Sequence, residues 1–195
     1  MNDSAPVVGR TFGAFLIVLG LPGLAASFTL AVDKYRILED PSFQPSCNFN
    51  PVLSCGSVMV KEQASAFGFP NPLLGVMAFS VVIALGVLIT ARVPMPRWVL
   101  GGLAVGSALG VVFVHWLAFQ SLYRIGALCP WCMVVWTVTL PIFLWSLLLY
   151  ARQVPAVRRV AQAVWSVRFL VVLFWYLAFV VAILVQFWDY WSTLL

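Results

Sequence analysis

Residues 127–136 read ALCPWCMVVW, a pair of cysteines separated by two residues at the start of an apolar run that continues to Tyr150. Proline is favoured in the first turn of a helix, because its missing amide hydrogen would have no partner there in any case. We therefore expect Pro130 to open a helix, with Cys129 at or beside the N-cap. The positive end of the helix dipole would then stabilise the Cys129 thiolate. Cys132 would lie one turn further, roughly 4–5 Å deeper along the helix axis.

The chain as a whole is also strongly apolar. Of its 195 residues, 63% are hydrophobic and only 9% are charged, whereas a soluble domain carries about a quarter charged residues. Five uncharged runs reach the ~20 residues that a helix needs to cross a bilayer. They are residues 11–32, 73–91, 98–123, 125–150 and 169–188. The sequence thus predicts an all-α integral membrane protein, with a four-helix bundle core in residues 1–150 and an additional fifth transmembrane helix in 169–195.

Basic residues are distributed unevenly between the two sides of the membrane that five spans define. Seven would lie on the side of the N-terminus, namely Arg10, Arg92, Arg97, Arg152, Arg158, Arg159 and Arg168. Four would lie on the other side, namely Lys34, Arg36, Lys61 and Arg124. Because cytoplasmic segments carry the excess of Lys and Arg, we expect a cytoplasmic N-terminus. The net charge of +5 is then explained by topology, and no nucleic-acid partner is expected.

Two connecting segments and one glycine pattern add detail to this topology. Residues 33–71 are predicted to form the extracytoplasmic loop, with one short amphipathic helix in 57–69. Residues 151–168 are predicted to form a cytoplasmic basic loop. Gly102, Gly106 and Gly110 recur every four residues, a spacing that predicts close approach of the third span to a neighbouring helix.

Four cysteines, Cys47, Cys55, Cys129 and Cys132, would all lie at the outer face. An oxidising compartment favours disulfides, and three pairings are possible. A zinc site is disfavoured because one pair is separated by seven residues and the other by two, so no metal is expected. A disulfide within CPWC closes a very small ring and adds little stability, whereas such bonds are typically reducible and redox-active. The pattern indicates a relay between a protein thiol and a lipid-soluble acceptor.

The motifs CNFNPVLSC, FGFPNPLLG and LCPWC, the last opening a predicted span, resemble those of the vitamin K epoxide reductase family. The likeness covers about residues 10–150 and is closest to bacterial homologues that reoxidise DsbA-like proteins. The fifth span resembles that of actinobacterial members without a fused thioredoxin domain. The resemblance implies a four-helix bundle around a quinone site. It also implies a thioredoxin-fold partner that is supplied in trans.

The resemblance assigns a role to each cysteine. Cys129 and Cys132 would form the active-site pair, with Cys132 next to the quinone ring. Cys47 and Cys55 would form a shuttle pair, in which Cys47 exchanges with the partner and Cys55 with Cys129.

Four further residues are expected to bind the quinone: Asn71, Trp136, His115 and Phe67. Asn71 matches a family Asn that hydrogen-bonds a quinone carbonyl, although it would also suit the N-cap of the second span. Trp136 replaces a Tyr found in some members. His115 could instead make a structural hydrogen bond within the bundle, and Phe67 could pack in the core.

The predicted activity is that of a quinone-dependent membrane thiol oxidase in the cytoplasmic membrane of a bacterium. It would reoxidise a DsbA-like protein at the extracytoplasmic face and pass electrons to menaquinone or ubiquinone. Two alternatives stay open. One is reduction of vitamin K epoxide or a related quinone in a quinone cycle, and the other is a non-enzymatic bundle with structural disulfides.

Overall fold

The structure is a computed structural model that describes residues 9–193. Its five long helices are α1 (Arg10–Glu39), α3 (Pro72–Thr90), α4 (Arg97–Gln120), α5 (Pro130–Ala151) and α6 (Arg158–Gln186). All five are long and apolar enough to cross a membrane, counting α4 together with the π-helical turn η2 (Ser121–Ile125). The short elements are α2 (Cys55–Met59), η1 (Glu62–Ser65) and α7 (Trp188–Trp191). The predicted all-α membrane fold is confirmed.

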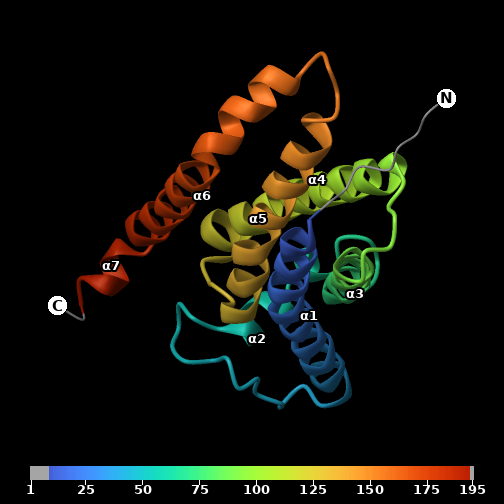
Figure 1. Cartoon of the computed structure of the whole chain (residues 1–195). Coiled ribbons are helices and arrows are strands. Elements are labelled where there is room, and N and C mark those ends of the chain that lie inside the picture. The colour runs from blue at the N-terminus through green and yellow to red at the C-terminus, as the bar shows by residue number, and fades with distance from the viewer. Residues whose placement is uncertain (1–8, 194–195) are drawn as a thin grey trace.

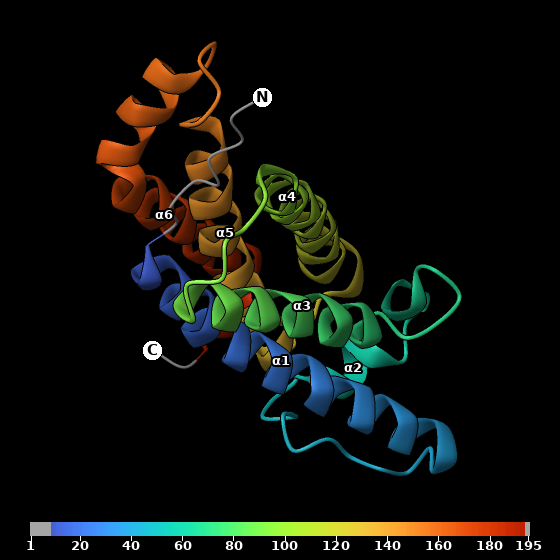
Figure 2. The ribbon, with the colours of Figure 1, turned by 45° about the vertical axis from the view of Figure 1, so that its right-hand side comes forward.

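Helices α1, α3, α4 and α5 form a bundle, and Figure 2 shows α1 and α3 side by side along their length. Two glycines allow this close packing. A Cβ added at Gly13 would lie 2.7 Å from the Gly86 carbonyl oxygen, and one at Gly86 would lie 2.8 Å from that of Gly13. Both distances are shorter than any real contact of a Cβ atom, so neither position has room for a side chain. The adjacent core includes Leu16, Phe79 and Ile142.

The fifth long helix, α6, lies outside this bundle against α5, and is drawn orange to red in Figure 1. The Tyr176 hydroxyl donates to the Thr137 carbonyl of α5 at 2.6 Å. The Arg168 guanidinium lies over the rings of Trp165 and Phe169. The remaining surface of α6 is largely exposed apolar side chains such as Phe174, as suits a helix that faces lipid.

Several predicted boundaries need correction. Helix α1 continues to Glu39, so the first part of the segment 33–71 is helical. Helix α6 begins at Arg158, so most of the predicted basic loop 151–168 is also helix. The single helix expected in 57–69 is divided between α2 and η1. Residues 1–8 and 194–195, which the predicted domains include, lie outside the described range.

The fourth long helix begins at Pro130, as the prediction from the Cys129–Pro130 pair has it, although the uncharged apolar run starts earlier, at Ile125. Ile125 closes η2, and Gly126 follows with a positive φ of 70°, a conformation in which glycine has no steric penalty. The amide of Gly126 donates to the Ser121 carbonyl at 3.0 Å. The chain therefore turns at Gly126, and α5 begins at Pro130.

Candidate redox site

Short backbone pairing joins the segment before Cys55 to the segment before Cys129. Leu53 and Leu128 form an isolated parallel bridge. The Ser54 amide donates to the Leu128 carbonyl at 2.8 Å, and the Leu128 amide donates to the Val52 carbonyl at 2.7 Å. Each cysteine follows its bridge residue by one or two positions, so the pairing brings Cys55 and Cys129 together.

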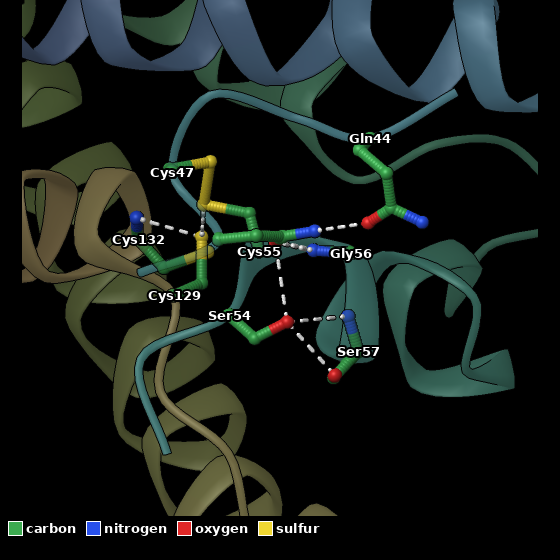
Figure 3. The surroundings of a disulfide bond; sticks show 9 residues. Gln44, Cys47, Ser54, Cys55, Gly56, Ser57, Cys129 and Cys132 are labelled. Atoms are coloured by element: carbon green, nitrogen blue, oxygen red, sulfur yellow. Dashed lines mark hydrogen bonds between the residues drawn. A yellow bond between two sulfur atoms is a disulfide. The ribbon is translucent and has the colours of Figure 1, made fainter. Parts of the chain in front are cut away.

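Three sulfur atoms meet at this point. Cys47 and Cys55 form a disulfide, and Cys129 and Cys132 are free thiols. The Cys129 Sγ lies 3.3 Å from the Cys55 Sγ, and Figure 3 shows the Cys55 sulfur between those of Cys47 and Cys129. This is the arrangement that thiol–disulfide exchange requires, because the attacking sulfur must contact the sulfur it attacks.

Cys129 is the N-cap of α5, as its sequence predicts. Its Sγ accepts a hydrogen bond from the Cys132 amide at 3.3 Å. An N-cap acceptor satisfies one of the amides that have no partner at a helix start. The same geometry favours negative charge on the sulfur during exchange.

Three of the four cysteines are almost completely buried. Cys55 and Cys129 are 0% exposed, and Cys47 is 3% exposed. The cysteine loop (residues 40–59) covers Cys129, whereas Cys132 is half-buried and lines a cavity inside the bundle. Access to Cys129 from the aqueous side is therefore through the cysteine loop.

Asn48 organises the cysteine loop, and the sequence reasoning did not identify it. Its Oδ1 accepts from the Gly56 amide at 2.9 Å and from the Ser54 hydroxyl at 3.1 Å. Its Nδ2 donates to the Gln44 side chain at 2.9 Å. The Ser54 Oγ in turn accepts from the Ser57 amide at 3.2 Å, which caps α2. The one available signal was a polar amide directly after a loop cysteine.

The cavity next to Cys132 has a volume of about 780 Å³ and an apolar lining from α1, α3, α4 and α5. Polar side chains line it near the cysteines. They are Lys34, Asn71, Gln120 and Ser121, at or beside the ends of these helices, and Gln63 of η1. A long apolar cavity with few polar groups at one end fits an amphiphilic ring with an apolar tail.

The glycines of α4 line this cavity. A Cβ added at Gly102 or Gly106 would meet no atom within 4 Å, and both residues lie on the cavity wall with Gly110. The prediction that this stripe packs closely against a neighbouring helix is therefore wrong for Gly102 and Gly106. Their missing side chains enlarge the cavity instead.

Two of the four predicted quinone residues lie at the cavity. Trp136 is 3% exposed and forms part of the wall. Asn71 lines the cavity while its side chain holds the η1 segment: Nδ2 donates to the Gln63 carbonyl at 2.6 Å, and Oδ1 accepts from the Ala66 amide at 2.9 Å. Its side chain makes no capping hydrogen bond to α3, so the alternative N-cap role does not hold.

The other two residues predicted to bind the quinone, His115 and Phe67, do not line this cavity. His115 faces α6, where its Nε2 accepts from the Trp175 indole at 2.8 Å, and its Nδ1 lies 2.7 Å from the Val111 carbonyl oxygen. Neither His115 nor Phe67 is part of the cavity lining. Phe67 is exposed on the loop and lies against the rings of Phe69 and Phe113.

The fifth helix reaches the redox site indirectly. Phe187, at the end of α6, belongs to one apolar cluster with Val52, Leu128 and Trp136. Tyr190 and Trp191 of α7 pack against the same cluster. This cluster supports both the backbone pairing that aligns the cysteines and one wall of the cavity.

The comparisons with known proteins agree with this geometry. Residues 14–147 match the model of the vitamin K epoxide reductase family, which is more than half of the chain. The chain belongs to the vitamin K epoxide reductase family. The match covers both cysteine pairs and the cavity, and ends before α6 begins. A comparison with curated proteins finds no match. Membership identifies a multi-pass membrane redox protein with a cysteine pair, in a family that is associated with quinones.

Proposed function

We propose that this family member is a thiol oxidase that transfers electrons from a DsbA-like thioredoxin-fold protein to a membrane quinone. The partner is supplied in trans at the extracytoplasmic face of a bacterial cytoplasmic membrane. Residues 1–150, with the extracytoplasmic segment 33–71, form the redox domain. Residues 169–195 add a transmembrane helix to it, joined through 151–168.

The observation that supports this proposal most directly is the position of the two cysteine pairs. The Cys129 Sγ contacts the Cys55 Sγ at 3.3 Å on one side, and Cys132 borders the apolar cavity on the other. A pair of structural disulfides needs no free CPWC thiols and no cavity beside them. A two-electron relay needs both.

The electron route follows from these contacts. A partner thiolate attacks Cys47 of the Cys47–Cys55 disulfide and releases Cys55 as a thiolate, and the partner's second thiol then resolves the mixed disulfide. Cys55 attacks Cys129 of an oxidised CPWC pair and releases Cys132. Cys47 then attacks Cys55, which restores the loop disulfide and leaves Cys129 and Cys132 reduced. The cysteine pairs of the described structure are in this last state.

The cavity has the composition that a quinone requires. The quinone would accept the two electrons and two protons of the CPWC dithiol. Asn71 retains one amide hydrogen beyond the bond to Gln63 and can donate it to a ring carbonyl. Trp136 offers an apolar ring face, and the wall at Gly102 and Gly106 leaves space for an apolar tail such as that of menaquinone or ubiquinone.

The buried disulfide implies a movement of the cysteine loop. Cys47 is 3% exposed, so a partner thiolate can reach it only when the chain before Cys47 moves away. Residues 40–44 and 46 are largely exposed, whereas Ser54 is fixed by backbone pairing to Leu128. We expect Cys47 to leave the site while Cys55 remains near Cys129.

Arginine contacts support the proposed orientation. Arg10 donates to the Thr90 carbonyl at 3.0 Å, and Arg97 donates to the Gln153 carbonyl at 3.0 Å. These contacts gather basic residues at the end of the bundle away from the cysteines. Because cytoplasmic segments carry the excess of Lys and Arg, this distribution supports the proposal that the cysteines face outwards.

A coupled assay tests the proposal. Purified protein in detergent is mixed with a reduced DsbA-like protein and a water-soluble ubiquinone or menaquinone analogue, and quinone absorbance is followed. We expect turnover in the wild type, none in Cys132→Ser, and a trapped Cys55–Cys129 disulfide in that variant. Turnover that survives Cys47→Ser and Cys55→Ser would contradict the proposed route. Reduction of vitamin K epoxide without oxidation of the partner would favour the alternative activity.

A further inference from the structure

Asp33 is a buried acid with an unsatisfied oxygen. It is 6% exposed within α1, and its Oδ2 has no hydrogen-bond partner. Among residues 9–193, no other Asp or Glu is buried. A buried carboxyl group without a partner is costly, and an ionisable group at membrane depth commonly has a function.

The side chain of Asp33 lies on the face of α1 that packs against the cysteines. Asp33 follows Leu30 by three residues and precedes Ile37 by four, and residues at this spacing share one face of a helix. Leu30 and Ile37 belong to the cluster that contains Cys47, Cys55, Cys129 and Cys132. Figure 3 shows the α1 ribbon passing beside the disulfide.

The basic side chains next to Asp33 in α1 make other contacts. The Lys34 Nζ donates to the Met59 carbonyl at 2.6 Å. The Arg36 guanidinium lies 5.5 Å from the centre of the Phe43 ring and acts on Asp33 through its charge. On the same helix Glu39 is exposed. The titratable groups in the apolar cluster that Leu30 and Ile37 join are the cysteine thiols.

We propose that Asp33 carries the proton during exchange between the loop cysteines and the CPWC pair. This inference rests on the proposed function, because it assigns a role within the same cysteine site. Exchange consumes one thiolate and releases another, so a proton must leave the attacking thiol and return to the released sulfur. In an apolar cluster closed to water, a nearby carboxyl group can hold that proton.

The resolving step illustrates the balance. The Asp33 carboxylate takes the proton of the Cys47 thiol, and the Cys47 thiolate attacks Cys55 of the Cys55–Cys129 disulfide. The Cys47–Cys55 bond forms, the Cys55–Cys129 bond breaks, and the Cys129 thiolate leaves with the electron pair. Asp33 then protonates Cys129, which regenerates the carboxylate. The described structure is the product of this step, with the Cys129 thiol still 3.3 Å from the Cys55 sulfur.

A single-turnover experiment separates this role from a structural one. Fully reduced, full-length protein is mixed with excess ubiquinone analogue. The first equivalent of quinone is consumed as CPWC is oxidised, and the second follows exchange with the loop thiols. Cys47→Ser must abolish the second phase. Acid quenching and alkylation of the same samples identify which cysteines are joined at each time.

Asp33→Asn keeps the size of the side chain and removes its ability to titrate. We expect an unchanged first phase and a second phase slowed by roughly 10²–10⁴-fold near neutral pH, the range typical of general acid–base catalysis. In Asp33→Asn the rate of the second phase should rise about tenfold per pH unit, because the attacking thiol then has to lose its proton without help from a carboxylate. Asp33→Glu should restore most of the rate, and Asp40→Asn, at an exposed acid, should match the wild type.

Two results would overturn the role of Asp33. One is a second phase in Asp33→Asn with the rate and pH profile of the wild type. The other is equal slowing of both phases, as expected if the substitution only disturbs packing. Initiating oxidation with diamide and reading exchange by alkylation gives the same comparison without quinone. If the purified protein does not reduce quinone, the proposed function is refuted. The diamide experiment then still tests whether Asp33 assists exchange between the cysteine pairs.

Discussion

Removing the Asn48 side chain with Asn48→Ala should release the cysteine loop from its docked position. The substitution deletes two partly buried hydrogen bonds to Oδ1, from the Gly56 amide and the Ser54 hydroxyl, and one exposed bond to Gln44. At about 1 kcal/mol for each partly buried bond and little for the exposed one, docking should lose about 2 kcal/mol. That loss shifts the docked population relative to the undocked one by roughly 30-fold.

The effect should be visible in the rate at which Cys55 reaches Cys129. In a Cys132→Ser background, formation of the Cys55–Cys129 disulfide is measured by quenched alkylation. Hydrogen exchange of the amides in residues 52–57 is measured in parallel. We expect slower trapping and faster exchange of these amides in Asn48→Ala. Gln44→Ala is the matched control, since it removes only the exposed bond.

Two unchanged measurements in Asn48→Ala would refute this prediction: hydrogen exchange of the amides in residues 52–57 at the rate of the parent protein, and formation of the Cys55–Cys129 disulfide at the rate of the parent protein. Such a result would mean that the backbone pairing of Val52 and Ser54 with Leu128 holds the loop without the Asn48 network. Faster formation of the Cys55–Cys129 disulfide in Asn48→Ala would also contradict the prediction, because it would show that docking of the cysteine loop hinders thiol–disulfide exchange.

Three further predictions concern the bundle and the cavity. Gly13→Ala should lower the free energy of unfolding by about 1–3 kcal/mol, because its Cβ would lie 2.7 Å from the Gly86 carbonyl oxygen; thermal denaturation in detergent checks this, with Gly102→Ala expected to be neutral. Gly106→Leu should raise KM severalfold for a long-tailed quinone and leave KM for a tailless analogue nearly unchanged, since the added side chain enters the cavity; equal effects on both would place the tail elsewhere. His115→Phe should leave KM for quinone unchanged and destabilise the protein by about 1 kcal/mol, because His115 bonds Trp175 outside the cavity; a large rise in KM would contradict this.

Much of this protein follows from local sequence. Hydropathy and length predict the spans, because a chain in a bilayer must satisfy its backbone hydrogen bonds internally and helices do so within one segment. Pro130 after Cys129 predicts the helix start, because that preference acts between neighbouring residues. The boundaries that were wrong, such as the start of α6 at Arg158, involve polar residues that can continue a helix beyond the apolar run.

Local sequence does not predict the direction in which each side chain of a membrane-spanning helix points. The long helices are apolar on most sides, so hydrophobic periodicity does not distinguish a lipid face from a cavity face or a packed face. His115 was therefore assigned to the quinone site although it faces Trp175, and the α4 glycines were assigned to helix packing although Gly102 and Gly106 line the cavity.

The sequence by itself determined that this is a membrane bundle with two cysteine pairs, one of them at a helix start, because span length and helix capping are local properties. Only the tertiary structure decided that Cys55 contacts Cys129, 74 residues away, and that Asp33 is buried on the α1 face that Leu30 and Ile37 share. Those contacts depend on the Leu53–Leu128 pairing and on the rotation of α1, which arise when distant segments pack together and have no local signal.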